Sequence, residues 1–210
     1  ILNESGLLAL RPARPCLAGQ RWLWDGVAFE VLHPQAQEVA AAERAKHSNA
    51  TSCVLRISAA AGGDGAPGAS GASAAALLVG DIELAQEQAL LARGAPLAAD
   101  WLLAAHHGSK SSSGAAFLDA VQPRTVMVQA GYRNRYGHPA PEVLARYAEH
   151  HIRVVESTRC GAATWASAAP DEVQCERTQR QHYWAHVPPP SSTHDGAIDG
   201  TGGSAAVMAR

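Results

Sequence analysis

The chain has 210 residues, 47% of them hydrophobic and 5% aromatic, and is long enough to bury the core of one domain. Its 17 Lys and Arg residues against 19 Asp and Glu residues give a net charge of −2, which excludes binding of nucleic acid through bulk positive charge. No apolar run approaches the roughly 18–20 residues of a membrane span. The first residue is Ile1, without a basic-then-apolar leader, and we therefore expect a fragment or a processed product.

The first predicted element is a β-hairpin. Within Arg21–Leu32, the Asp25-Gly26 dipeptide is typical of a two-residue turn, and alternate apolar residues share one face of each strand, as Trp22 and Trp24 do on the first. The alanine-rich segment Gln35–Lys46 fits either a weak helix or a mobile loop. Another strand is expected over Ser52–Ser58. The Gly- and Ala-rich segment Ala59–Ala74 after it is predicted to be a flexible surface loop.

From residue 75 onward, short apolar strands alternate with helices, which indicates a layered α/β domain. The expected strands are Ala75–Val79, Trp101–Ala105, Thr125–Gln129 and Ile152–Glu156. The expected helices are Glu83–Arg93, a helix from an N-cap at Ser113 to Val121, and Pro141–His151. Shorter strands at Ala162–Ala166 and Val173–Arg177 are expected to finish the sheet. We assign residues 1–187 to one domain and predict a disordered Pro-, Gly-, Ser- and Ala-rich tail over residues 188–210.

Polar clusters follow three successive apolar strands of this predicted sheet. The clusters are Gly80-Asp81, His106 through Ser109, and Asn134 through Pro139. Because the carboxyl ends of strands line one crevice in layered α/β proteins, we expect these clusters to lie close together. One carboxylate with two or three histidines suits a metal such as zinc or manganese.

Each of these residues also has an ordinary structural interpretation. Asp81 could cap the helix that begins at Ile82, and His106-His107 could be a simple turn. His150-His151 lie at a helix end and fit an interaction with the helix dipole. The remaining histidines, including His33, are interpreted as structural or surface residues. A Ser-His-Asp hydrolase is disfavoured because no GxSxG motif is present.

Taken in order, these motifs resemble a known family. The string LLVGDIELAQEQAL at residues 77–90, followed by HHGSKSSSG at 106–114 and GYRNRYGHP at 131–139, resembles the C-terminal metallo-β-lactamase-like domain of ComEC-type DNA-internalisation proteins. The stretches CLAGQRWLWDGVAFEVLHP at 16–34 and CERTQRQHYW at 175–184 resemble parts of the same domain. The resemblance covers roughly residues 15–186, and its specificity lies in the combination of GD, HHGS and YGHP.

This resemblance implies the C-terminal portion of an αβ/βα sandwich with a metal-dependent hydrolase site. The parent protein would contain a membrane channel, act with other competence proteins, and hold this domain on the periplasmic face of the cytoplasmic membrane. There the domain would act as a nuclease that hydrolyses the non-entering DNA strand.

The resemblance also implies roles for particular residues. Asp81 matches the aspartate that bridges two metal ions, and His107, or else His106, matches a late histidine ligand. His106 or His138 would contact phosphoryl oxygens or protonate the leaving group. The residues expected to hold the substrate are Ser109, Lys110, Ser111, Asn134 and Tyr136.

One departure from the family is clear. The family's upstream HxHxDH-type motif is absent from residues 1–58, and the chain is expected to carry only half of a metal site. We therefore expect the chain alone to show little nuclease activity. A superfamily hydrolase of another phosphodiester or an amide, and a non-catalytic docking module, remain alternatives.

Four cysteines, none of them in CxxC spacing, argue against a zinc ribbon and leave disulfides or buried free thiols as alternatives. A periplasmic location would permit disulfides. Cys16 precedes the first hairpin and Cys53 begins the next strand, whereas Cys160 and Cys175 flank a short hairpin. These two pairings are therefore the expected ones.

Overall fold

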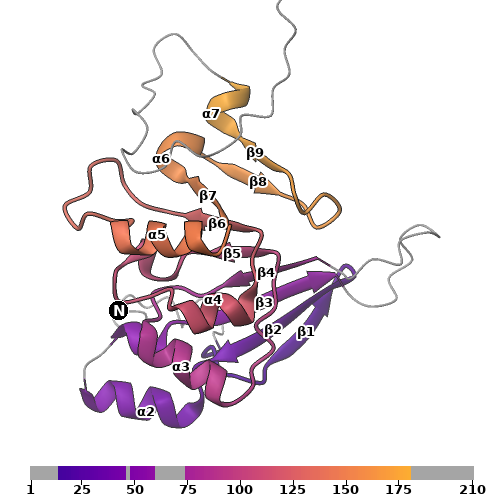
Figure 1. The fold of residues 1–210 in the computed structure, drawn as a ribbon. Coiled ribbons are helices and arrows are strands. Elements are labelled where there is room, and N and C mark those ends of the chain that lie inside the picture. The colour runs from indigo at the N-terminus through magenta and orange to yellow at the C-terminus, as the bar shows by residue number, and fades with distance from the viewer. Residues whose placement is uncertain (1–13, 46–47, 60–73, 181–210) are drawn as a thin grey trace, which may run out of the picture.

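A seven-stranded mixed sheet forms the centre of the computed structural model, which describes residues 14–45, 48–59 and 74–180 (Figure 1). The strands lie side by side in chain order, antiparallel from the first to the fourth and parallel from the fourth to the seventh. They are β1 (Arg21–Trp24), β2 (Val27–His33), β3 (Val54–Ala59), β4 (Ala75–Leu78), β5 (Trp101–Leu103), β6 (Thr125–Val128) and β7 (Arg153–Glu156). The predicted mixed α/β class is confirmed.

The predicted hairpin forms from β1 and β2. Its two turn residues, Asp25 and Gly26, have φ angles of 48° and 74°, which suit a turn whose twist matches that of the strands. Trp22 lies opposite Phe29, and their rings stack with centroids 5.1 Å apart. This cross-strand aromatic pair fixes the register of the hairpin.

Three helices connect the parallel strands and lie on the same face of the sheet (Figure 1). They are α3 (Leu84–Ala92), α4 (Ala115–Val121) and α5 (Pro141–Glu149). Successive right-handed crossovers that advance in one direction place every connecting helix on one face. The main core lies between this face and the helices, where Leu77, Leu102 and Val126 are fully buried beside Phe117 and Tyr147.

The alanine-rich segment left open by the sequence is a helix, α2 (Ala36–Ala45), and a short 3₁₀ helix, η1 (Ser48–Thr51), follows it. The predicted flexible loop falls almost entirely on residues 60–73, outside the described part of the chain. The predicted tail, residues 188–210, also lies outside the described residues.

The two short C-terminal strands correct one prediction. β8 (Ala163–Trp165) and β9 (Val173–Cys175) form their own two-stranded sheet, flanked by α6 (Ser157–Cys160) and α7 (Glu176–Gln179), and do not finish the large one. The physical reason is that the two short strands pack against the second face of the large sheet and do not pair with its edge. Met127 and Val155 point to that face, away from the helices, and are buried there in one cluster with Val173 of β9.

The start of α4 corrects a second prediction, because Gly114 and not Ser113 is its N-cap. Ser113 has a φ of 56° and is fully buried, and its hydroxyl lies 2.8 Å from the hydroxyl of Tyr147 on α5. This contact to a neighbouring helix occupies the side chain that the sequence assigned to the cap.

Both expected disulfides form. Cys16 is bonded to Cys53 and Cys160 to Cys175, with Cα–Cα separations of 5.9 Å and 4.6 Å. No cysteine is left free, so the free-thiol alternative is wrong. The first bridge ties the segment before β1 to the start of β3, and the second ties α6 to β9.

Candidate functional site

Asp81 lies just beyond the carboxyl end of β4, where a tight turn presents it at the sheet edge. Gly80 has a φ of +55°, and a Cβ added there would lie 3.1 Å from the Cβ of Ser52, so the turn requires glycine. The backbone N–H of Asp81 donates to the Ser52 hydroxyl at 3.1 Å. The N-cap of α3 is Glu83, so the alternative in which Asp81 caps this helix is wrong.

His107 faces Asp81 from the end of the next strand. Its Nε2 lies 3.4 Å from Asp81 Oδ1, and its Nδ1 lies 2.8 Å from the carbonyl oxygen of Gln129. A carbonyl oxygen only accepts, so Nδ1 carries the proton in the neutral ring, and Nε2, the nitrogen near Asp81, is then unprotonated. Metal-ligating histidines commonly donate their second ring N–H to a backbone carbonyl in this way.

His106 and His138 stand beside this pair. His106 Nδ1 lies 3.2 Å from Glu83 Oε1 without hydrogen-bond geometry, and the ring centroids of His106 and His138 are 5.9 Å apart. His138 Nδ1 is buried and has no hydrogen-bond partner among the described residues. Burial, followed by the neighbouring charges of His106 and His107, lowers the pKa of His138.

The backbone of the two adjacent histidines is strained. His106 and His107 lie in η2 (Ala105–Gly108) with φ angles of 47° and 57°, in the left-handed region that non-glycine residues rarely adopt. The His106 N–H donates to the carbonyl of Gly80 at 2.9 Å, which ties this turn to the end of β4. Such strain is concentrated at functional sites because surrounding contacts must hold it in place.

A buried carboxylate accepts hydrogen bonds from the backbone of the loop that follows the two histidines. Glu87 on α3 is 1% exposed and accepts the backbone N–H groups of Ser113 at 2.5 Å and Gly114 at 2.8 Å. Burial raises the pKa of Glu87 even though these two N–H groups and the nearby Arg146 act in the opposite direction. Arg146 on α5 donates to the carbonyls of Ser112, at 2.7 Å, and Ser113.

The three predicted phosphate-contacting residues of this loop differ in accessibility. Ser109 is 7% exposed, and its hydroxyl lies 3.1 Å from that of the half-buried Ser111. Lys110 is exposed at the surface between them. Lys110 is therefore the residue of this group best placed for an incoming anion, and all three substrate roles stay predictions.

Asn134 organises the loop that carries Tyr136 and His138. Its Nδ2 donates to the carbonyls of Gly131 and His138, and its Oδ1 accepts the N–H groups of Tyr136 and His138. The side-chain amide is thus occupied within the loop. Tyr136 is 66% exposed, and the predicted contacts of both residues with substrate stay predictions.

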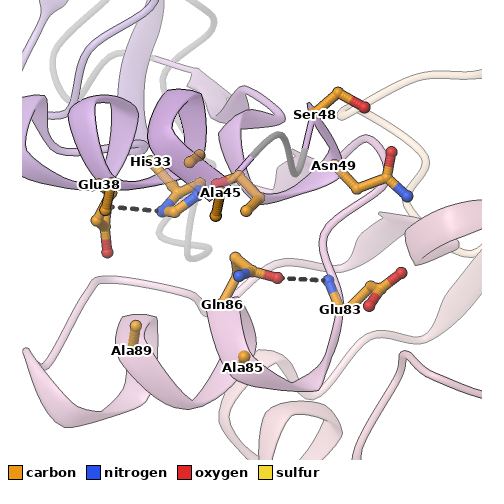
Figure 2. Close-up of a pocket in the computed structure, with 12 residues that line it drawn as sticks. His33, Glu38, Ala45, Ser48, Asn49, Glu83, Ala85, Gln86 and Ala89 are labelled. Atoms are coloured by element: carbon orange, nitrogen blue, oxygen red, sulfur yellow. Dashed lines mark hydrogen bonds and ion pairs between the residues drawn. The ribbon is translucent and has the colours of Figure 1, made fainter.

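The same edge of the molecule contains a pocket of about 530 Å³ between α2 and α3 (Figure 2). Figure 2 shows His33 and Glu38 on one side of it and Gln86 and Glu83 on the other. Because Glu83 also approaches His106, the pocket adjoins the histidine cluster.

His33 is structural, as the sequence suggested. It is 1% exposed, with Nδ1 3.0 Å from Glu38 Oε2 and Nε2 2.9 Å from the carbonyl of Ala50. Burial lowers the pKa of His33. Glu38 is also paired with Arg93 at 2.9 Å, so His33 and Glu38, which line the pocket, already have polar partners within the protein.

Sequence reasoning missed three residues that shape the site, namely Ser52, Glu83 and Glu87. Glu83 could have been noticed as a second acid two positions after Asp81. Ser52 contacts Asp81 across 29 residues, and Glu87 contacts Ser113 and Gly114 across 26 and 27 residues. Nothing in the sequence indicates those contacts. In the described ranges, no group of three or more His, Cys, Asp or Glu side chains is arranged to hold a metal ion.

Comparison with known proteins finds relatives that are named as competence or recombination proteins, although no family model matches the chain. Competence protein ComA of Neisseria gonorrhoeae is 38% identical over 167 residues, which cover 77% of this chain and 21% of the relative. ComE operon protein 3 of Bacillus subtilis is 40% identical over 85 residues, covering 40% of the chain and 11% of the relative. Recombination protein 2 of Haemophilus influenzae is 28% identical over 174 residues, covering 82% and 19%. The chain therefore spans about one fifth or less of the length of these relatives.

Proposed function

The chain belongs to the ComEC family of competence proteins, and from this premise we propose that it contributes to metal-dependent hydrolysis of DNA during DNA uptake. The observation that carries the proposal is the pair formed by Asp81 and His107. Asp81 Oδ1 lies 3.4 Å from His107 Nε2, the ring nitrogen that is unprotonated in the neutral ring when Nδ1 donates to the Gln129 carbonyl.

The separation of these two atoms fits a shared metal ion. Two ligands bound tetrahedrally to zinc at about 2.0–2.1 Å stand about 3.3–3.4 Å apart. The distance of 3.4 Å between Asp81 Oδ1 and His107 Nε2 agrees with this value. Zinc and manganese are the proposed ions, two of them in the complete site, with further ligands supplied by another part of the polypeptide.

The second face of the sheet supports an αβ/βα sandwich. Successive strands place Phe29, Ile57, Ala76 and Trp101 in one row on the face away from the helices, and Trp22 at the end of that row is 45% exposed. The β8–β9 unit packs at the other end of this face, on Met127 and Val155 among others. In the proposed fold, a second sheet from a preceding part of the protein packs on the aromatic end.

The chemistry assigns a separate task to each residue. When bound, the divalent ions supply a nucleophilic water at neutral pH and neutralise charge on the phosphate. Asp81 and His107 would hold them, and His106 or His138 would donate a hydrogen bond to a phosphoryl oxygen or a proton to the leaving group. Lys110 would pair with a flanking phosphate.

The two disulfides support a location outside the cytoplasm. Disulfides persist in oxidising compartments such as the bacterial periplasm, and all four cysteines are paired here. No helix in the described ranges is long and apolar enough to cross a bilayer. We place the domain on the periplasmic face, beside the membrane channel of the same polypeptide and other competence proteins.

The test uses the chain within the longest polypeptide that its gene encodes, supplied with Mn²⁺ or Zn²⁺ and linear DNA. Asp81→Asn should lower the cleavage rate by about 100-fold or more, because the variant loses a charged ligand. The matched control is Asp119→Asn, which makes the same change from carboxylate to amide at a side chain that is 70% exposed on α4, and it should leave the rate unchanged. Full activity of a folded Asp81→Asn protein would refute the proposal.

Two other functions give different results in the same experiment. Cleavage of a small phosphodiester such as bis(p-nitrophenyl) phosphate without cleavage of DNA would identify another hydrolase of the superfamily. A non-catalytic docking module is the second candidate, favoured by the absence of a three-ligand group among the described residues. It predicts no heat of Mn²⁺ or Zn²⁺ binding in calorimetry.

A further inference from the structure

The connection between β6 and α5 carries exposed aromatic and cationic side chains next to the histidine cluster. Residues 131–138, which we call the arm, protrude from the body of the domain (Figure 1). Tyr132 is 45% exposed and Tyr136 is 66% exposed, and Arg133 and Arg135 are also exposed. The arm contains no Asp or Glu, although the chain has a net charge of −2.

Each tyrosine of the arm has an arginine close to its ring, and Tyr136 also stacks on His138. The guanidinium carbon of Arg133 lies 5.2 Å from the ring centre of Tyr132, and that of Arg135 lies 4.8 Å from the ring centre of Tyr136. Tyr136 stacks on His138 with centroids 5.9 Å apart and an interplanar angle of 19°. The stack of Tyr136 on His138 therefore leads from the surface to the candidate site.

Hydrogen bonds within the arm hold it in this conformation. The Asn134 amide makes four hydrogen bonds within the arm, and Arg133 and Gly137 adopt φ angles of 52° and 67° that permit the tight turn. Its base is joined to the histidine turn, because the N–H of Ala140 donates to the carbonyl of Gly108 at 2.8 Å. A surface that is ordered in advance loses less conformational entropy on binding.

We propose that the arm binds single-stranded DNA and delivers it to the candidate site, an inference that rests on the proposed hydrolysis of DNA. Unpaired bases stack on tyrosine rings and on guanidinium planes, and arginines pair with phosphates. Duplex DNA offers its phosphates to Arg133 and Arg135, but its bases are already stacked and unavailable to Tyr132 and Tyr136. The arm therefore selects single strands over duplexes.

Fluorescence anisotropy tests this with a labelled 20-nucleotide strand of mixed sequence, alone and annealed to its complement, in EDTA so that no cleavage occurs. Tyr136→Ala should weaken single-strand binding by about 5- to 150-fold, equivalent to about 1–3 kcal/mol for one stacked base. Tyr136→Phe keeps the ring and should bind within about twofold of the unmodified chain. Duplex binding should change little in both variants.

Charge is tested separately by salt dependence. Arg135→Ala should reduce the slope of log K against log salt concentration by about 0.7, the value for one phosphate contact on a single strand. Arg180→Ala removes an exposed arginine at the C-cap of α7, outside the arm, and should leave the slope unchanged. Circular dichroism establishes that each variant is folded, which is expected since both arm side chains are exposed.

The outcomes separate this inference from the proposed function. Single-strand affinity unchanged by Tyr136→Ala, or weakened equally for duplex, would overturn the inference even if the protein hydrolyses DNA. A large loss on Tyr136→Ala that is absent in Tyr136→Phe would support it even if the Asp81→Asn protein keeps full nuclease activity or the unsubstituted protein cleaves no DNA.

Discussion

The loop that carries the histidines and serines depends on Glu87, and its replacement should have a large and specific effect. Glu87 is 1% exposed and accepts two backbone N–H groups, those of Ser113 and Gly114. Leaving a buried N–H without an acceptor costs about 1–3 kcal/mol. Glu87→Ala should therefore lower the free energy of unfolding by about 3–5 kcal/mol, since it also removes the charge that faces Arg146.

Glu87→Gln separates the contribution of the hydrogen bonds from that of side-chain volume. Its amide oxygen can accept one N–H, but its NH₂ group would face the second, so we expect about half the loss seen with alanine. Urea unfolding at pH 7, followed by tryptophan fluorescence, measures both variants, and a lower midpoint with an unchanged slope identifies a change in stability. Gln88→Ala on the exposed side of the same helix is the matched control and should change the midpoint little.

Hydrogen exchange gives a local measurement of the same contact. The amides of Ser113 and Gly114 should exchange faster in Glu87→Ala than in Gln88→Ala, because only the first variant removes their acceptor. A loss of less than about 1 kcal/mol in Glu87→Ala, with both amides still protected, would refute the reasoning.

Three further predictions concern stability. Replacing Cys16 and Cys53 together with alanine should lower the free energy of unfolding by about 4 kcal/mol in urea, since the bridge spans 37 residues; a loss below about 1 kcal/mol would contradict this. Burial lowers the pKa of His33 below 6.5, so unfolding releases a ring that takes up a proton. The free energy of unfolding contributed by the neutral ring is therefore complete above pH 6.5, the unfolded pKa. It is lost as the pH falls below 6.5 toward the lower pKa of the folded state. The dependence should weaken in His33→Gln when urea unfolding is measured from pH 8 to 5. Gly108→Ala should lower the melting temperature more than Gly137→Ala, because both have positive φ but only Gly108 is crowded; equal melting temperatures would count against the packing argument.

Local patterns predicted much of the fold because they reflect local physics. The Asp25-Gly26 turn, the strand–helix alternation after residue 75 and both disulfide pairings follow from spacing and residue type, and all are present. The N-cap at Ser113 and the place of β8 and β9 were predicted wrongly. In both cases a distant partner, Tyr147 for Ser113 and the second sheet face for β9, determined the outcome.

The site divides in the same way. Asp81, His107 and His138 could be found because each follows an apolar strand or its loop, and strand ends gather at one edge. The residues that hold these side chains in place could not be predicted. Ser52, just before β3, and Glu87, on α3, contact the site residues across long separations in the sequence. The hydrogen bond between His107 Nδ1 and the Gln129 carbonyl could not be predicted either, because no sequence pattern reveals the position of that carbonyl.

The match between strand order in the sheet and strand order in the chain has a consequence for biogenesis. Each strand from β2 to β7 pairs with the strand that precedes it in the sequence, and none is inserted between two strands already paired. The large sheet can therefore grow at one edge while the polypeptide emerges, N-terminal end first, from a ribosome or a translocation pore. Each nascent strand meets a template that is already in place, so the time during which an unpaired edge is exposed to aggregation is short.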